Sequence, residues 1–360
     1  MNVISHPLES GPATDAKHIR SVPALNCCLC GRAGQFLYSA QPDRLFGASG
    51  SWNLKQCANR VCGLIWLDPM PLAEDIGKAY ASYYTHEGQI ENDRAGLLKR
   101  IYGVMKRGYL RARYNYQTAP RSAVGAIMGK LLYLFPLRRA EVDAEVRFLP
   151  SVPGGRLLDV GCGSGEWLAW MRDLGWRVEG VDSDESANRI ARQQGLVIHR
   201  GRVEQQRFPD NSFDAVTLNH VIEHVSDPVG TLAECCRILK KGKKLYLATP
   251  NSSSLGHRLF KQDWRGLEPP RHLHIFDPRS MAGLLDTAGL GGGASIRTIN
   301  SSYMWEHSFR LWRGESETAP GRGRRVAAQI ATSFLTLLGH VLPLGRANSG
   351  EWMAVEAVKS

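Results

Sequence analysis

Residues 157–165 read Leu157-Leu158-Asp159-Val160-Gly161-Cys162-Gly163-Ser164-Gly165. A short apolar run ends in an acid, and three glycines then alternate with small residues. This pattern predicts a buried parallel strand over 156–160, a tight turn, and a helix over 166–174 whose first N–H groups face the turn. Because glycine allows positive φ and close approach of a ligand to the backbone, we expect a nucleotide-like ligand at this helix start.

The spacing of the glycines separates this loop from two common phosphate-binding loops. The dinucleotide fingerprint G-x-G-x-x-G is one residue longer, and no Gly-Lys-Ser/Thr follows as in a P-loop. An acid two residues before G-x-G-x-G resembles the first motif of class I S-adenosylmethionine (SAM) methyltransferases. That resemblance implies SAM as the ligand, bound by Asp159, Gly161, Cys162, Gly163 and Gly165.

The chain from 154 onward alternates short apolar runs with helical patterns, which is typical of an α/β sheet. We expect strands over 156–160, 177–181, 197–200, 213–219, 244–248, 295–299 and 351–358, and helices over 185–194, 229–239 and 281–288. Asp182 closes the second strand, where a carboxylate can accept two hydrogen bonds from a ribose diol.

Several later segments carry the resemblance further. They are Phe213–Val216, His220–Val225, Asp227-Pro228, Leu239–Gly242, Thr249–Asn251 and Trp264–Phe276. Together they resemble class I SAM-dependent methyltransferases, in the branch with an N-terminal cysteine-rich zinc ribbon. The resemblance covers residues 27 to 300 and the last strand. It implies a Rossmann-like seven-stranded sheet with an antiparallel last strand, a zinc ribbon and a helical cap.

The resemblance also implies where the rest of the cofactor lies. Ser183 follows Asp182, and Val203 and Glu204 follow the third strand, where the family places an acid near the adenine. Asn219 and His220 end the fourth strand, near the methionine end of the cofactor.

Two cysteine pairs precede this domain. Cys27-x2-Cys30 and Cys57-x4-Cys62 are each followed by a glycine, which suits a tight turn around a metal. Four thiolates bind Zn²⁺ tetrahedrally and leave no open position, so we expect a structural zinc. The alternatives are a set of buried free thiols, or Cys28 replacing a member of the first pair.

The net charge of +11 comes from one segment. Residues 94–140 contain no Asp or Glu, and their basic residues account for the whole excess: Arg94, Lys99, Arg100, Lys106, Arg107, Arg111, Arg113, Arg121, Lys130, Arg138 and Arg139. The ordinary interpretation is a set of helices that dock beside the catalytic domain with a solvated basic face. Because aromatic residues interleave these charges, contact with an anionic membrane surface or a lipid phosphate is the sharper hypothesis. No nucleic-acid-binding motif is visible, so nucleic acid is not an expected partner.

The domain boundaries follow from these changes of pattern. The N-terminus lacks the apolar core of a signal peptide, which favours a cytoplasmic protein. The basic segment adds the hypothesis of a peripheral position at the inner membrane surface. Residues 326–345 lack charged residues but contain several polar ones, which predicts an inserted amphipathic helix rather than a membrane span. We expect a disordered tail (1–22), a zinc ribbon (23–75), a basic helical cap (76–153), the SAM-binding core (154–300), and a helical insertion with the last strand (301–360).

Methyl transfer to a hydroxyl benefits from a general base whose pKa lies near neutrality, and the unperturbed pKa of histidine suits that role. By resemblance, Glu223 and His224 border the acceptor pocket, so we expect His224 as base with Glu223 orienting it. His220, His272 and His274 are rival candidates, and both histidines of the 220–224 segment can equally serve only to shape the pocket.

Three further features near this segment need an interpretation. Arg271 can hold an anionic group of the acceptor. Tyr80, Tyr83 and Tyr84 are expected on a short helix, either packing or reaching the active site. His220-x-x-Glu223-His224 matches an inverted zinc-protease pattern, which its place after a methyltransferase strand argues against.

Three hypotheses for function remain. The first is a SAM-dependent methyltransferase acting on a small-molecule or lipid-linked sugar or glycan acceptor. The second is an O-methyltransferase of quinone or polyketide type. The third is a SAM-binding, membrane-associated protein without catalysis.

Overall fold

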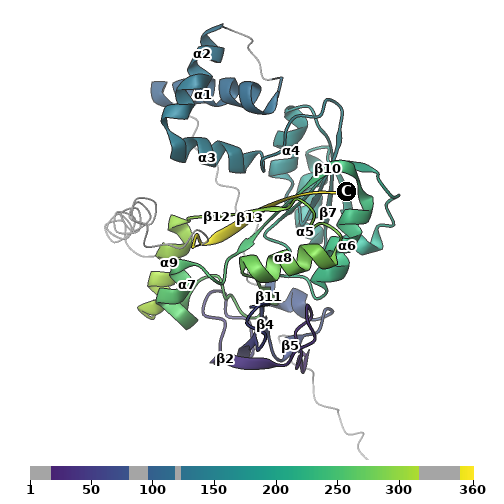
Figure 1. Cartoon of the computed structure of the whole chain (residues 1–360), viewed down its shortest axis with the longest axis vertical. Coiled ribbons are helices and arrows are strands. Elements are labelled where there is room, and N and C mark those ends of the chain that lie inside the picture. Colours follow the sequence, from purple (N-terminus) through teal and green to yellow (C-terminus); the bar gives the residue numbers. More distant parts are fainter. Residues whose placement is uncertain (1–17, 81–95, 118–122, 316–348) are drawn as a thin grey trace, which may run out of the picture.

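The computed structural model describes residues 18–80, 96–117, 123–315 and 349–360. A large mixed sheet forms its centre (Figure 1). The cysteine-rich part lies at one end of the molecule, and the basic helices α1 and α2 lie at the opposite end.

The central sheet has seven strands in the order β12-β13-β10-β9-β6-β7-β8. Neighbouring strands are parallel except at β13, which runs antiparallel to both β10 and β12. This confirms the expected class I methyltransferase sheet with an antiparallel last strand. The strands are β6 (Arg156–Val160), β7 (Arg177–Asp182), β8 (Val197–Arg200), β9 (Phe213–Asn219), β10 (Leu239–Pro250), β12 (Ser295–Ile299) and β13 (Trp352–Val358).

The helices of the described residues are distributed along the whole chain. They are α1 (Leu97–Tyr114), α2 (Ala123–Leu131), α3 (Pro136–Glu145), α4 (Glu166–Asp173), α5 (Glu185–Gln193), α6 (Pro228–Ile238), α7 (Leu255–Phe260), α8 (Pro278–Thr287) and α9 (Ser302–Trp312). Four short 3₁₀ helices add to them: η1 (Ile76–Tyr80), η2 (Leu132–Leu134), η3 (Val203–Gln205) and η4 (Lys261–Asp263).

Two neighbouring leucines of β6 show how the sheet forms a core on each face. Successive side chains of a strand point to opposite faces. Leu158 therefore packs in a cluster with Leu232 of α6 and Met281 of α8. Leu157 packs in a second cluster with Leu168 of α4 and with residues of the cap helices. The unbroken apolar run of β6 follows from this burial on both sides.

The cysteine-rich part shares its sheet with the methyltransferase core. Strands β2 (Gly34–Gln41), β3 (Trp52–Cys57) and β4 (Ile65–Leu67) form an antiparallel sheet. Its fourth strand is β11 (His274–Ile275), which pairs with β4. The histidine-rich loop of the core is thereby built into the cysteine-rich part. A separate pair, β1 (Ser21–Val22) and β5 (Met70–Pro71), closes its N-terminal side.

Several sequence expectations need correction. Ser21 and Val22 were expected in a disordered tail, but they form β1, and Arg20 is bound by the Asp75 carboxylate. Strand β10 is longer than expected because it begins directly at the end of α6 and includes a bulge. Tyr83, Tyr84 and the 326–345 segment lie outside the described residues. In the described part of the chain, no helix is long and apolar enough to cross a membrane.

Candidate functional site

The glycine loop leaves β6 with its backbone in the left-handed region. Gly161 has φ 72° and Gly163 has φ 53°, conformations that other residues rarely adopt. A side chain on Gly161 would overlap Val221. A side chain on Gly163 would meet no atom within 4 Å, so this residue faces open space. The loop therefore presents bare backbone at the carboxyl edge of the sheet, where ligands of open α/β sheets bind.

Asp182 lies beside this open backbone, as expected. Its Oδ2 accepts from the Gly163 N–H at 2.8 Å, and its Oδ1 accepts from the Asp184 N–H at 2.9 Å. Burial raises the pKa of Asp182, while these two N–H groups oppose the rise. Each oxygen keeps a second lone pair, so the carboxylate is positioned to accept two hydroxyl groups.

Asp159 is committed to a partner within the protein. Its Oδ1 accepts from the Thr217 hydroxyl at 2.7 Å and is paired with Arg147. The Arg147 guanidinium also stacks on Trp167, 3.4 Å from the ring centroid. Asp159 is buried, so its contacts with Thr217 and Arg147 hold the end of β6 in place beneath the glycine loop. Arg147 lies before the first core strand, and no motif in the sequence marks it.

The other expected cofactor residues differ in what they can offer. Ser183 and Asn219 are exposed at the same edge, and Cys162 is half-buried. The Val203 side chain is buried in the core, so only its backbone can reach a ligand. The Glu204 carboxylate accepts from the Thr231 hydroxyl of α6. That contact turns Glu204 toward a helix, and it does not support Glu204 as an adenine ligand.

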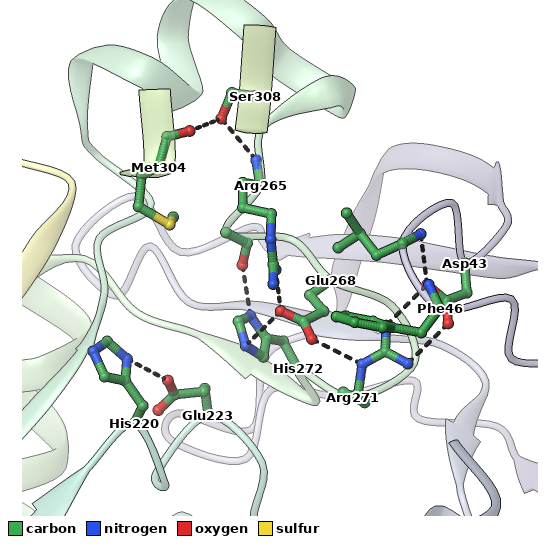
Figure 2. Close-up of polar contacts among 12 residues, drawn as sticks. Asp43, Phe46, His220, Glu223, Arg265, Glu268, Arg271, His272, Met304 and Ser308 are labelled. Atoms are coloured by element: carbon green, nitrogen blue, oxygen red, sulfur yellow. Dashed lines mark hydrogen bonds and ion pairs between the residues drawn. The ribbon is translucent and has the colours of Figure 1, made fainter. Parts of the chain in front are cut away.

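His220 and Glu223 form a dyad beyond the end of β9 (Figure 2). Nδ1 of His220 lies 3.2 Å from Oε1 of Glu223, and the Thr249 hydroxyl donates to Oε2 at 3.0 Å. Burial of Glu223 would raise its pKa, but the His220 hydrogen bond and the nearby histidines lower the pKa to about 2. The ionised carboxylate requires a proton on Nδ1 of His220, which leaves Nε2 as the basic nitrogen. The His220 ring packs edge-on against Trp352 of β13, with 4.7 Å between ring centroids.

His224 is oriented by a different group from the one expected. Its Nδ1 lies 3.0 Å from the Arg271 carbonyl oxygen, which can only accept a hydrogen bond. Nδ1 therefore carries the proton and Nε2 is the basic nitrogen. The expectation that Glu223 orients His224 was wrong, because both Glu223 oxygens serve His220 and Thr249. The Tyr80 hydroxyl also lies 3.0 Å from Nδ1 of His224, so one of the three expected tyrosines does reach this site.

His272 and His274 are poor candidates for the base. Nδ1 of His272 bonds the Gly266 carbonyl at 2.7 Å, and Nδ1 of His274 bonds the Val225 carbonyl at 3.1 Å. Both rings are buried. Burial lowers the pKa of each to about 4, although Glu268 and Glu223 oppose the change at His272 and Asp227 opposes it at His274. A base this weak is poorly matched to proton transfer near neutrality.

Arg271 does not receive the acceptor, contrary to expectation. Its side chain is fully buried and forms two 2.8 Å hydrogen bonds with Asp43 and one of 2.8 Å with Glu268 (Figure 2). Arg265 pairs with the second oxygen of Glu268. Asp43 belongs to the cysteine-rich part, so this network joins the two parts of the molecule. It also holds the backbone carbonyl that orients His224.

The four expected zinc ligands come together. The Sγ atoms of Cys27 and Cys62 lie 3.6 Å apart, and those of Cys30 and Cys57 lie 3.4 Å apart. All four lie within 4.8 Å of one another. Zn–S bonds of about 2.3 Å in a tetrahedron require S–S separations of about 3.8 Å, so the cluster fits zinc. Cys28 is exposed and lies outside the cluster.

A second group of ligand types occurs beside the histidines. Glu223, His224 and His272 offer ligand atoms within 4.8 Å of one another. This set differs from the inverted zinc-protease pattern, because His272 takes the place of His220. Both Glu223 oxygens already accept hydrogen bonds from His220 and Thr249, so the Glu223 carboxylate is satisfied without an ion.

Comparison with known proteins identifies the domain. Residues 137–292 match the methyltransferase domain family. The ubiquinone biosynthesis O-methyltransferase of Hahella chejuensis is 36% identical over 123 residues, which are 32% of this chain and 50% of that protein. The enzyme of the same name from Xanthomonas oryzae pv. oryzae is 37% identical over 125 residues, covering 33% and 51%. The chain thus spans about half the length of the curated relatives it matches.

Solved structures are more distant. A SAM-dependent methyltransferase from Thermotoga maritima, described as a possible histamine N-methyltransferase, is 20% identical with a TM-score of 0.41, covering 73% of this chain and 94% of that chain. One from Mesorhizobium loti is 19% identical with a TM-score of 0.41, covering 61% and 98%. At these scores the fold assignment rests on the strand order observed here.

The strand order, the open glycine loop and the match over residues 137–292 agree with one another: this part of the chain has the class I methyltransferase fold and is similar to the methyltransferase domain family.

Proposed function

We propose that this protein is a SAM-dependent O-methyltransferase whose acceptor is an aromatic hydroxyl of quinol type. One observation carries the proposal. The glycine loop, the Asp182 carboxylate and two histidines lie at the carboxyl edge of the central sheet, and Nε2 of both histidines has no hydrogen-bond partner among the described residues. A donor site and candidate bases are therefore presented on the same side of the molecule.

The residues of the loop fit SAM. Asp182 would accept the ribose hydroxyls, the open backbone at Gly163 would lie against the cofactor, and the backbone at Val203 would lie near the adenine. When bound, SAM supplies a methyl group activated by its sulfonium. The protein then has to bring the acceptor oxygen in line behind that methyl group and exclude water.

His224 is the base that we propose. Nε2 of His224 would take the proton of the acceptor hydroxyl, while bound SAM would supply the methyl group and leave as S-adenosylhomocysteine. The Arg271 carbonyl keeps the proton on Nδ1 and thus keeps Nε2 basic. His220 is the rival base, held by Glu223 in the same tautomer. We place His272 and His274 in the wall of the site.

The relatives support a quinone-type acceptor, because two curated proteins that are 36% and 37% identical over about a third of this chain are named for ubiquinone biosynthesis. A lipid-linked sugar or glycan is tested beside it as a second acceptor class.

The test separates binding from chemistry. Methyl transfer from labelled SAM is measured with a catechol or quinol and with a nucleotide-sugar and lipid extract, using wild type, His224→Ala and His220→Ala. We expect transfer to the aromatic hydroxyl, and a fall of about 10²- to 10⁴-fold in kcat for His224→Ala with little change in SAM affinity. Unchanged turnover would remove His224 from the mechanism, and transfer only to the sugar or lipid pool would overturn the quinol assignment.

We also propose that Cys27, Cys30, Cys57 and Cys62 hold a structural zinc. The metal would stabilise the cysteine-rich part of the chain. This part contacts the core at two places: Asp43 forms hydrogen bonds with Arg271, and β4 pairs with β11. Its role would be to support the histidine-rich loop, because four thiolates leave no position for a substrate.

A further inference from the structure

Helices α1 and α2 cross with their backbones in contact. Side chains on Gly108 or Gly129 would overlap the main chain of the opposite helix. Gly125 and Gly129 of α2 are buried in this crossing, and Leu132 directly after α2 is buried with them. Glycines spaced in this way permit close helix pairs of the kind common in lipid. Because the α1 contact uses the small residues of α2, its large apolar side chains point elsewhere.

Those side chains form an exposed row at helical spacing. Val124 is 65% exposed, Ile127 is 64% exposed and Leu134 is 72% exposed, with Leu131 and Phe135 also exposed in the same stretch. Residues 124, 127 and 131 follow the three-and-four spacing of one face of α2, and Leu134 continues the row in the 3₁₀ helix η2. Single exposed apolar residues are normal on soluble proteins, but a continuous row marks an interaction surface.

Basic residues border this row. Lys130 lies between Ile127 and Leu131, and Arg138 and Arg139 follow Phe135. Among the described residues, Lys130 and Arg139 pair with no carboxylate, while Arg138 pairs with Glu141 at 2.9 Å.

The acids nearby are already committed. Glu145 pairs with Lys106, and Asp143 accepts from the Tyr109 and Tyr114 hydroxyls. The apolar row is therefore flanked by positive charge that the neighbouring acids do not cancel.

We propose that the exposed apolar side chains of Val124, Ile127, Leu131, Leu134 and Phe135, together with Lys130, Arg138 and Arg139, form one surface, the α2 face, which docks on an anionic lipid surface. The apolar row enters the boundary between headgroups and acyl chains, and the flanking cations meet lipid phosphates. A lipid surface fits better than a second protein, because a bilayer offers both an apolar layer and negative charge in one plane. Figure 1 shows α1 and α2 away from the central sheet, at the end of the molecule opposite the cysteine-rich part. The inference is independent of the acceptor.

Vesicle binding of the purified full-length protein tests this proposal. We expect sedimentation with phosphatidylcholine vesicles that contain phosphatidylglycerol, weak sedimentation with phosphatidylcholine alone, and a loss of binding as salt increases. Ile127→Ser with Leu134→Ser should lower the partition coefficient by about tenfold per side chain. Lys130→Ala should lower it by about fivefold.

The matched control is Leu259→Ser, which removes a similarly exposed side chain from α7, outside the α2 face. It should bind vesicles like wild type, and all variants should keep the wild-type circular dichroism and SAM affinity. Absence of vesicle binding, or equal binding by the Ile127→Ser/Leu134→Ser variant, would overturn the proposal. A protein that self-associates in solution, and whose self-association rather than vesicle binding is lost in that variant, would assign the face to a second copy of the chain instead.

Discussion

Removal of the Asp43 carboxylate should unbalance the buried charge network. Arg271 is fully buried, and Asp43 supplies two of its hydrogen bonds at 2.8 Å. In Asp43→Ala, Glu268 alone would face two guanidinium groups, those of Arg265 and Arg271. Breaking a buried ion pair by removing one partner costs about 3–5 kcal/mol. The variant also loses the hydrogen bonds from the Leu45, Phe46 and Ala48 N–H groups to the carboxylate, so we expect the upper part of that range.

Urea unfolding followed by tryptophan fluorescence measures this loss, with Glu141→Ala as the control. That control breaks the Arg138–Glu141 pair, in which both side chains are more than half exposed, and should cost less than about 1 kcal/mol. Asp43→Ala combined with Arg271→Met should recover much of the stability, because Glu268 then faces Arg265 alone. If Asp43→Ala costs no more than Glu141→Ala, the network does not stabilise the junction and our reasoning fails.

Three further outcomes are expected. Asp182→Ala should weaken SAM binding by about 10- to 150-fold in calorimetry, from the loss of charge-assisted hydrogen bonds, and an unchanged affinity would exclude the ribose contact. Purified protein should contain one zinc per chain by elemental analysis, and Cys57→Ser should lower both the zinc content and the urea midpoint; metal-free protein of full stability would refute the site. Because burial lowers the pKa of His272 and of His274 to about 4, the unfolded chain binds protons that the folded chain does not between pH 6.5 and 4. Stability should therefore fall as the pH falls through that window, and His274→Asn should flatten the dependence of the urea midpoint on pH; an unchanged slope would contradict the assigned cause.

The local pattern of the sequence was sufficient for the architecture. The run from Leu157 to Gly165 predicted strand, turn and helix, because burial on both faces demands a continuous apolar strand and the turn demands glycine. The strand ending at Asp182 and the strand over 213–219 followed from the same alternation of patterns. The spacing of Cys27, Cys30, Cys57 and Cys62 likewise anticipated their convergence, since two tight turns are enough to bring paired thiols together.

The partners of the polar side chains depended on the tertiary structure. The sequence suggested that Glu223 orients its neighbour His224. In the fold, however, Glu223 forms a hydrogen bond with His220, and His224 forms one with the carbonyl of Arg271, which is 47 residues away. Arg271 was expected to face an acceptor, but Asp43 from the cysteine-rich part neutralises it in the interior. Local patterns report burial and backbone conformation, which neighbouring residues determine. A hydrogen bond or ion pair between distant segments depends on how whole elements pack, and here a shared strand pair, β4 with β11, brings those segments together.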